Sequence, residues 1–232
     1  MKNWQLKPTL NQTFELVGRG DFDFVSVMRR AERLQADNRI DEACNERYAA
    51  VQRLIDILPD DEDIILEWND RNSRAALEVT EASARDHLLI GDVEMAAALC
   101  EMVLELDPED HLEALPLAAF CYVALGDYDS FDEIADDLSD KSPEKHILNL
   151  WAAFRRTGSL PDGELRIFRE RFGEYFDEFV RSDHPADEQY RAEMEKETPS
   201  RRTQARHLWL QTEPLWLQNK DFINQLGIRN FE

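Results

Sequence analysis

The chain has 232 residues, of which 43% are hydrophobic, and its formal net charge at pH 7 is −22. This composition is typical of a folded globular protein, and the negative charge argues against binding to nucleic acid or to anionic membrane surfaces, because both attract Lys and Arg. No apolar run approaches the roughly 18 residues of a transmembrane helix, and Met1–Lys7 has no apolar signal core, so we expect a cytoplasmic protein without membrane contacts.

The chain begins with a segment that we expect to be an N-terminal arm with little structure of its own, over residues 1–20. Its apolar residues are candidates for packing on the first helix: Trp4, Leu6, Phe14 and Leu16. Residues 21–35 predict that helix because their apolar side chains recur at helical spacing. Asn38–Ala43 is typical of a turn and the start of a second helix, which we expect to run on to Pro59.

Residues 60–90 carry a nearly continuous helical pattern. Asp60–Asp63 predicts an acidic helix N-terminus, which the helix dipole favours. Asn69–Ser73 is a candidate break. The later part is lined by Ala76, Val79, Ala82, Ala84 and Leu88. Gly91 is expected to end this helix, because Gly adopts the left-handed C-cap conformation at little cost.

The following stretch repeats with a period of 35 residues, from Gly91 to Gly126. Each of these glycines is followed by an Asp and, seventeen residues after the Gly, by a proline, Pro108 or Pro143. A period of about 34 to 35 residues with such punctuation indicates stacked helical hairpins. We expect one helix over residues 110–125 and a second that Pro143 ends.

These residues resemble the tetratricopeptide repeat (TPR) family over about residues 77–143. The family has Gly at the turn between its two helices, a small residue early in the second helix and Pro at the end of the unit. The first unit matches at all three positions, Gly91, Ala96 and Pro108. In the next unit, Phe131 replaces the small residue. The resemblance implies an all-α fold, a TPR-like α-solenoid of about three to four stacked hairpins in residues 21–158.

Residues 159–232 predict a helical C-terminal extension. Within it, we expect residues 186–206 to form one highly charged helix. The tail from His207 onward is rich in large apolar side chains, among them Trp209, Leu215, Trp216, Phe222, Leu226 and Phe231. Two interpretations are open. The tail covers the exposed end of the array, or it contacts a partner or a second copy, so the chain is a monomer or a homodimer through this tail.

The resemblance also implies a binding site, because first helices usually line the ligand groove of TPR proteins. Carried over by position, the groove contains Glu78, Glu81, Arg85, Leu88, Glu113, Phe120, Val123 and Arg155. The set mixes acidic and apolar side chains, which suits a protein or peptide segment with a cation and an apolar anchor. It lacks the cluster of Lys and Arg that would hold a terminal carboxylate. We therefore expect a basic or basic-apolar partner.

The charge distribution fits the same expectation without requiring it. Gly91–Asp140 holds 15 Asp and Glu and no Lys or Arg. One interpretation is a solvated outer face of the second helices. The other is an acidic surface that steers basic peptides or proteins toward the chain.

No pattern in the sequence predicts a catalytic, cofactor or metal site. The histidines lack the spacing of metal ligands, and Cys44, Cys100 and Cys121 lack a CxxC spacing. We therefore expect a non-catalytic scaffold or adaptor protein. Two alternatives are a small acidic client chaperone that exposes Phe120 and Val123, and a structural or oligomerisation module that uses the aromatic tail.

Overall fold

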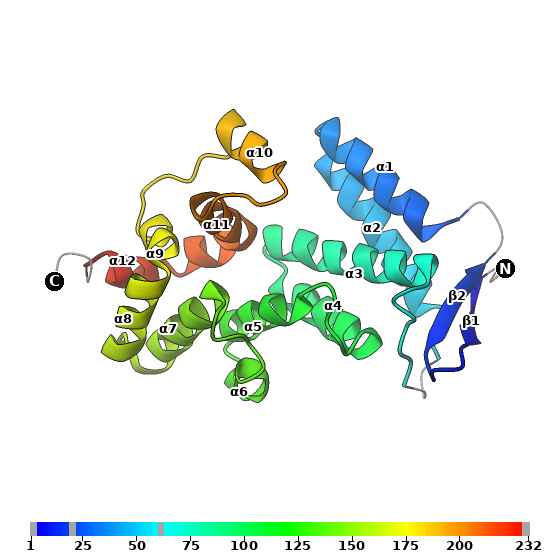
Figure 1. Cartoon of the computed structure of the whole chain (residues 1–232), viewed down its shortest axis with the longest axis horizontal. Helices are drawn as coiled ribbons and strands as arrows, with labels where there is room; N and C mark the ends of the chain where they lie inside the picture. Colours follow the sequence, from blue (N-terminus) through cyan, green and yellow to red (C-terminus); the bar gives the residue numbers. More distant parts are fainter. Residues whose placement is uncertain (1–3, 19–21, 60–62, 229–232) are drawn as a thin grey trace. The chain divides into compact units, whose positions relative to one another are not determined.

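The computed structural model describes residues 4–18, 22–59 and 63–228. In these ranges the chain forms twelve helices and one two-stranded antiparallel sheet (Figure 1). It divides into two compact units, one made of Met1–Leu88 with Asp92–Ala118 and the other of Leu89–Gly91 with Ala119–Glu232. The described chain is therefore mostly helical, as predicted, with a small β-hairpin that was not predicted.

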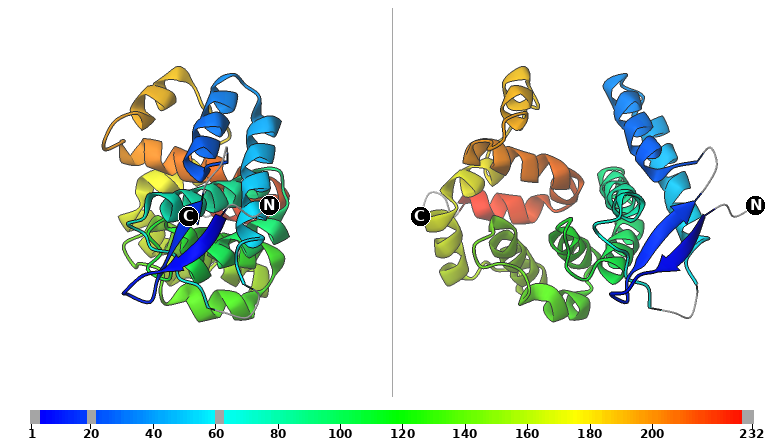
Figure 2. Two further views of the ribbon diagram at one scale, coloured as in Figure 1. Left: turned by 90° about the vertical axis from the view of Figure 1, so that its right-hand side faces the viewer. Right: turned by 45° about the vertical axis from the view of Figure 1, so that its right-hand side comes forward.

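The helices pack in sequential order along the chain. Helices α1 to α4 are Phe24–Ala36, Ile40–Ile55, Arg71–Leu89 and Val93–Leu106, and α5, which crosses between the two units, is Ala114–Leu125. Helices α6 to α12 are Tyr128–Ala135, Pro143–Thr157, Asp162–Arg171, Gly173–Phe179, Glu188–Met194, Arg201–Gln218 and Lys220–Ile228. Helices α1 and α2 lie side by side in both views of Figure 2.

The N-terminal segment is a β-hairpin where we expected an arm with little structure. Strands β1 (Trp4–Pro8) and β2 (Phe14–Gly18) pair antiparallel. Leu16 is fully buried, and its backbone N–H donates to Oγ of Ser73 at 3.0 Å. The ring of Trp4 packs edge-on against Phe24 of α1, with 5.4 Å between centroids, so the expected packing on the first helix is confirmed for Trp4. The short apolar alternation in each strand is the period-two signal that the prediction overlooked.

The segment before α3 is extended where we expected the start of a helix. Asp60–Glu62 lie outside the described residues, and residues 63–70 contain no helix. The N–H of Phe14 donates to the carbonyl of Ile65, and that of Leu66 to the carbonyl of Leu106, both at 2.8 Å. The segment thus lies between β2 and the end of α4 and forms backbone hydrogen bonds with both. Helix α3 begins only after Asp70, inside the predicted break.

Three pairs of helices are joined by the same left-handed turn. Asn38, Gly91 and Gly126 have φ angles of 59°, 86° and 76°. The residue after each donates its N–H to the carbonyl five positions earlier: Arg39 to Leu34, Asp92 to His87 and Asp127 to Tyr122, at 2.8, 2.9 and 3.0 Å. These bonds satisfy carbonyls at the helix end that would otherwise have no partner. The connections α1–α2, α3–α4 and α5–α6 therefore share a common turn, and α1 and α2 pack side by side as a helical hairpin.

Helices α4 and α6 begin with the same cap. The carboxylate of Asp92 accepts from the N–H of Met95 at 3.3 Å, and that of Asp127 accepts from the N–H of Ser130 at 3.2 Å. An N-cap carboxylate satisfies one free N–H and favours the positive helix end. Asp92 and Asp127 are thus the N-caps of α4 and α6, directly after the left-handed Gly91 and Gly126.

Helices α5 and α6 are both shorter than predicted. Helix α5 begins at Ala114 rather than near residue 110, because Asp110 is left-handed (φ 49°) and its carboxylate accepts from the N–H of Ala114 at 2.6 Å. Helix α6 ends at Ala135. Pro143 does not end α6 but is the first residue of α7, a position where its missing N–H has no consequence.

The charged stretch over residues 186–206 is two helices and not one. Helix α10 ends at Met194, and α11 begins after Pro199. The hydroxyl of Ser200 accepts from the N–H of Thr203 at 3.3 Å and so caps α11. Pro199 disfavours a helical conformation in the residue before it, which explains the interruption.

The aromatic tail is part of the core of the second unit. Trp216 is 1% exposed, and its ring lies 4.9 Å from that of Trp151 and 5.2 Å from that of Phe179, measured between centroids. Phe222 of α12 is also buried. The predicted tail residue Phe231 lies outside the described residues. The described aromatic side chains Trp209, Trp216 and Phe222 thus pack within the chain itself.

Candidate functional site

The apolar residues of the predicted groove are core residues. Leu88, Phe120 and Val123 are 0%, 2% and 0% exposed. The ring of Phe120 packs edge-on against Trp216 at 5.9 Å between centroids. Because these side chains are already covered, they offer no apolar anchor to a ligand, and their assignment to an open groove is wrong.

Among the charged groove residues of α3, Glu78 is partly exposed whereas Glu81 is largely buried, with its side chain 13% exposed, and each pairs with an arginine of the same helix. Nε of Arg74 lies 3.7 Å from Oε1 of Glu78, whose side chain is 40% exposed. Glu81 accepts from Arg85 one turn later. Burial raises the pKa of Glu81, against the opposing effect of Arg85. Helix α3 therefore presents a mixed acidic and basic surface.

The other two predicted residues occupy different settings. Glu113 precedes α5 in a left-handed conformation (φ 54°) and is exposed, so it is not on a first helix. Arg155, on α7, is exposed and donates from Nη1 to Oδ1 of Asn219 at 3.2 Å. The predicted set is also divided between the units, with Glu78, Glu81, Arg85, Leu88 and Glu113 in the first and Phe120, Val123 and Arg155 in the second.

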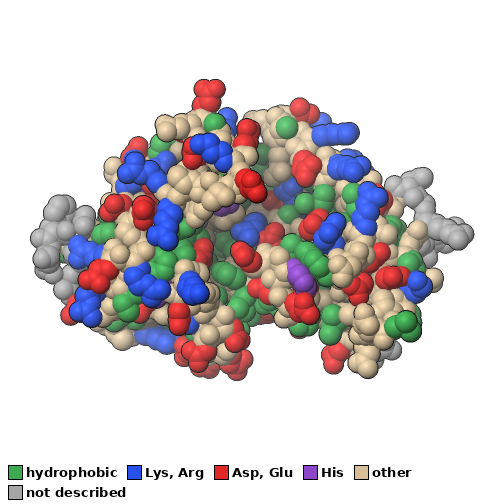
Figure 3. All heavy atoms as spheres, in the orientation of Figure 1, with side chains coloured by type: hydrophobic (Ala, Val, Ile, Leu, Met, Phe, Trp, Pro, Cys, Tyr) green, Lys and Arg blue, Asp and Glu red, His purple; other side chains and the backbone are tan. Residues whose placement is uncertain are grey.

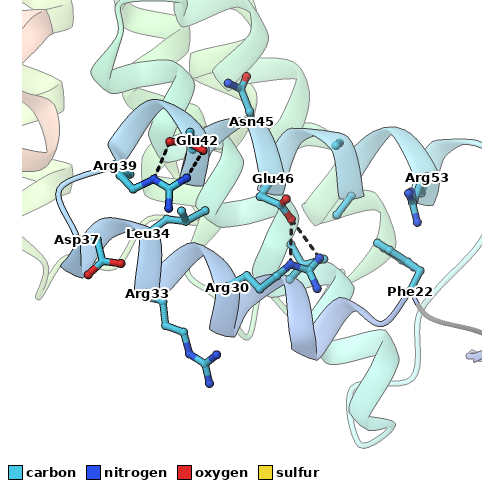
Figure 4. Close-up of a pocket in the computed structure, with 13 residues that line it drawn as sticks. Phe22, Arg30, Arg33, Leu34, Asp37, Arg39, Glu42, Asn45, Glu46 and Arg53 are labelled. Atoms are coloured by element: carbon cyan, nitrogen blue, oxygen red, sulfur yellow. Dashed lines mark hydrogen bonds and ion pairs between the residues drawn. The ribbon is translucent and has the colours of Figure 1, made fainter.

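The structure instead forms a groove along the α1–α2 hairpin, which we call the arginine groove (Figure 4). Its volume is about 630 Å³. Its polar lining is Arg30, Arg33, Asp37, Arg39, Glu42, Asn45, Glu46 and Arg53, and its apolar lining is Phe22, Val27, Leu34, Ala49 and Ala50. The volume lies within the range of about 300 to 1,000 Å³ that ligand sites occupy.

Two ion pairs lie in the arginine groove. Arg30 donates from Nε and Nη2 to Oε2 of Glu46, at 3.1 and 3.0 Å. Arg39 donates to both carboxylate oxygens of Glu42, at 2.7 and 2.5 Å. The hydrogen bond from Arg39 holds the pKa of Glu42 below its usual value. Exposed pairs of this kind are weak, so an incoming ligand can exchange partners with them.

The other two arginines keep donors available. The guanidinium of Arg53 lies over the ring of Phe22, 4.2 Å from its centroid. Arg33 projects from α1 away from the two ion pairs (Figure 4), and it makes no side-chain hydrogen bond or ion pair with the part of the chain that the structure describes. A guanidinium is planar and suited to gripping a carboxylate with two parallel hydrogen bonds.

A buried ion pair fixes the hairpin that carries this groove. Arg47 of α2 donates from Nε and Nη2 to the two oxygens of Asp86 of α3, at 2.6 and 2.8 Å. Their side chains are only 4% and 12% exposed. The two hydrogen bonds from Arg47 to Asp86 thereby hold the α1–α2 hairpin on α3. The side chains that line the groove therefore project from helices that are fixed in position.

The spacing of charged residues in this stretch indicates the groove, but the prediction considered only the apolar residues. Arg30, Arg33 and Asp37 are spaced three and four residues apart, and so are Arg39, Glu42 and Glu46. Such spacing places side chains on one face of a helix. The prediction used this stretch only for its apolar positions. The polar faces of α1 and α2 form a groove only when the two helices pack together, and the local sequence pattern does not predict that packing.

Other polar clusters in the described chain hold the structure together. Glu178 is 1% exposed and accepts from Arg206 and from Nδ1 of His184, the latter at 2.8 Å. His184 stacks on Trp209 with 3.8 Å between centroids. Within the described ranges, no three His, Cys, Asp or Glu side chains gather as metal ligands. These contacts hold neighbouring elements together and are not open to a ligand. The arginine groove is therefore the candidate binding site.

Two further findings concern the chain as a whole. None of the helices in the described ranges combines the length and apolarity needed to cross a bilayer. No family model, curated protein or solved structure matches the chain.

Proposed function

We propose that the chain is a non-catalytic adaptor whose TPR-like helical hairpins bind a segment of a partner protein. The observation that carries this proposal is the common turn of three hairpins, in which Asn38, Gly91 and Gly126 adopt the left-handed conformation. Two of these turns also share the Asp cap and the separation of 35 residues. Recurrence of a whole hairpin is the property of helical repeat arrays, which commonly serve as extended binding surfaces.

The charges of the described surface support a basic or basic-apolar partner. Acidic side chains gather on α6 (Figure 3), and Glu94 of α4 and Glu78 of α3 are also accessible to solvent. A net charge of −22 attracts cationic segments over a distance of about a Debye length, near 8 to 10 Å at ordinary ionic strength. With Leu88 and Phe120 buried, contacts with the partner are mainly polar.

No observation favours the two alternative functions over the adaptor. The chaperone alternative needs Phe120 and Val123 exposed, and both are buried. The oligomerisation alternative needs accessible aromatic residues in the tail, and Trp209, Trp216 and Phe222 are buried.

The adaptor proposal is tested by selecting peptides of about 12 residues, a length that spans about 40 Å when extended, on the purified full chain. Fluorescence anisotropy then measures the dissociation constant for wild type and for Glu78→Lys. We expect saturable binding of basic peptides and a weakening of about fivefold or more in the variant, because Glu78 would become a cation beside Arg74.

The control is Glu94→Lys, which makes the same change of charge on α4 and should weaken binding by less than about twofold. If no peptide binds saturably, the adaptor proposal is wrong. Equal weakening by both variants would show that α3 is not the contact surface.

A further inference from the structure

The arginine groove has a local charge balance opposite to that of the whole chain. The protein carries 49 Asp and Glu against 27 Lys and Arg. The groove reverses that balance, with Arg30, Arg33, Arg39 and Arg53 against Asp37, Glu42 and Glu46. A local excess of guanidinium groups in an acidic protein points to a ligand with anionic groups.

The lining of the groove favours carboxylates over phosphates. Three carboxylates stand among the four arginines, so the groove has only a small positive balance. A phosphate monoester carries a charge of about −1.5 to −2 at neutral pH, and the neighbouring acids would repel it more strongly than a singly charged carboxylate. Arginine forms the same two parallel hydrogen bonds with a carboxylate as with a phosphate, so a carboxylate ligand keeps these bonds while meeting less repulsion from the neighbouring acids.

The shape of the groove favours an extended chain. The lining runs along the hairpin from Phe22 and Arg53 to Asp37 and Arg39 at its turn (Figure 4). Helix α1 has 13 residues and is therefore about 20 Å long, which matches about six residues of extended polypeptide. Between the charged side chains, Leu34 and Ala49 provide apolar contact that is accessible to a ligand.

We propose that the arginine groove binds an acidic-apolar protein segment, in which side-chain carboxylates pair with Arg33 and Arg53 and an apolar side chain lies between them. This site is separate from the acidic surface that would receive a basic partner, and it does not depend on that proposed function. The chain would thus hold two protein segments of opposite charge.

The test uses two fluorescent peptides of about six residues, the length that α1 accommodates. One alternates Asp or Glu with Leu, and the other has the acids replaced by Lys. Anisotropy is measured on the full chain and on the variants Arg33→Gln and Arg53→Gln, whose folding is checked by thermal melting. Arg29→Gln is the matched control, since Arg29 is exposed on α1 but does not line the groove.

We expect the acidic peptide to bind saturably, with the affinity reduced about tenfold by either groove variant, as for loss of a paired charge, and less than about twofold by the control. Inorganic phosphate at millimolar concentration should not displace it. Displacement by phosphate, or equal loss in the Arg29→Gln control, would overturn the proposal. So would binding of the basic peptide alone, an outcome that leaves the adaptor proposal standing.

A second copy of this acidic chain is the other possible source of carboxylates. Sedimentation of the wild type at several concentrations distinguishes it. We expect the wild type and Arg33→Gln to have the same oligomeric state at every concentration. A dimer that this substitution dissolves would overturn the proposal and make the groove a contact between copies.

Discussion

At the residue scale, Arg47 shows how a charged side chain can be part of a helix interface. It is 3% exposed as a residue and is held by both carboxylate oxygens of Asp86. Burial alone would lower the pKa of Arg47, but the hydrogen bond and charge of Asp86 outweigh it and raise that pKa. The charge of Asp86 thus offsets the cost of keeping the guanidinium charged inside the protein.

Asp86→Ala should therefore destabilise the protein strongly. It leaves the Arg47 guanidinium buried without its counter-charge, and breaking a buried pair in this way costs about 3 to 5 kcal/mol. Urea unfolding measures the loss. Arg74→Ala, which removes the exposed pair with Glu78, is the control and should change stability by less than about 1 kcal/mol. A loss for Asp86→Ala as small as the control would mean that the pair does not hold α2 to α3.

His111 provides a pH-dependent contact. Its Nδ1 lies 2.8 Å from Oδ1 of Asp107, and its ring stacks on Trp68 with 4.4 Å between centroids. The hydrogen bond and the charge of Asp107 raise the pKa of His111 above its ordinary value. Since the folded-state pKa is the higher one, the interaction stabilises the protein fully below the unfolded pKa of about 6.5 and is lost as the pH rises through the folded-state pKa.

We expect an NMR titration of the His111 ring to give a midpoint above about 6.5. Asp107→Asn should lower that midpoint, because the amide oxygen still accepts from the backbone N–H of His111 but carries no charge. Unfolding at about pH 6 and about pH 8 should show a larger effect of the substitution at the lower pH. An unchanged midpoint in the variant would contradict the assignment.

At the element scale, left-handed turns join consecutive helices. Gly91 has a φ of 86°, a conformation that side chains with a Cβ adopt only with strain. Gly91→Ala should destabilise the protein by about 1 to 2 kcal/mol. Gly163 near the start of α8 has free space around an added Cβ and no positive φ, so Gly163→Ala should be neutral or stabilising by about 0.5 kcal/mol.

Thermal or urea unfolding of both glycine variants checks this prediction. The two substitutions add the same methyl group, so their difference isolates the backbone conformation. Equal effects would mean that the α3–α4 turn is not held in the left-handed conformation.

The elements also show what local sequence patterns can predict. Helices whose ends are set by neighbouring residues were predicted well, as at Gly91 with Asp92 and at Gly126 with Asp127. Elements that depend on distant hydrogen bonds were missed, because Phe14 pairs with Ile65 and Leu66 with Leu106. The arginine groove was missed for the same reason, since it needs α1 and α2 side by side. The apolar groove residues failed because helical periodicity marks an apolar position without telling what covers it.

At the scale of the whole molecule, net charge governs association rates. With a charge of −22, the chain should attract a basic segment at long range. Raising the salt from about 0.02 M to about 0.5 M shortens the Debye length to a few ångströms, and the association rate of a basic peptide should fall by about tenfold or more, with a smaller change in dissociation. Stopped-flow fluorescence measures both rates. A rate of association that does not depend on salt would contradict electrostatic steering.

The acidic peptide of the arginine groove should behave differently. The whole chain repels it at long range, while Arg33 and Arg53 attract it at contact. Added salt screens the repulsion, so its association rate should rise or stay level as salt increases. This contrast separates the local charge of the groove from the charge of the molecule.

The central claim, that the helical hairpins bind a protein segment, is tested most directly by an NMR map of the full chain titrated with a selected basic peptide. The account predicts saturable shifts of backbone amides concentrated on α3, around Glu78 and Glu81, with little change on α11. Shifts that do not saturate, or that are confined to α11 and α12, would contradict it.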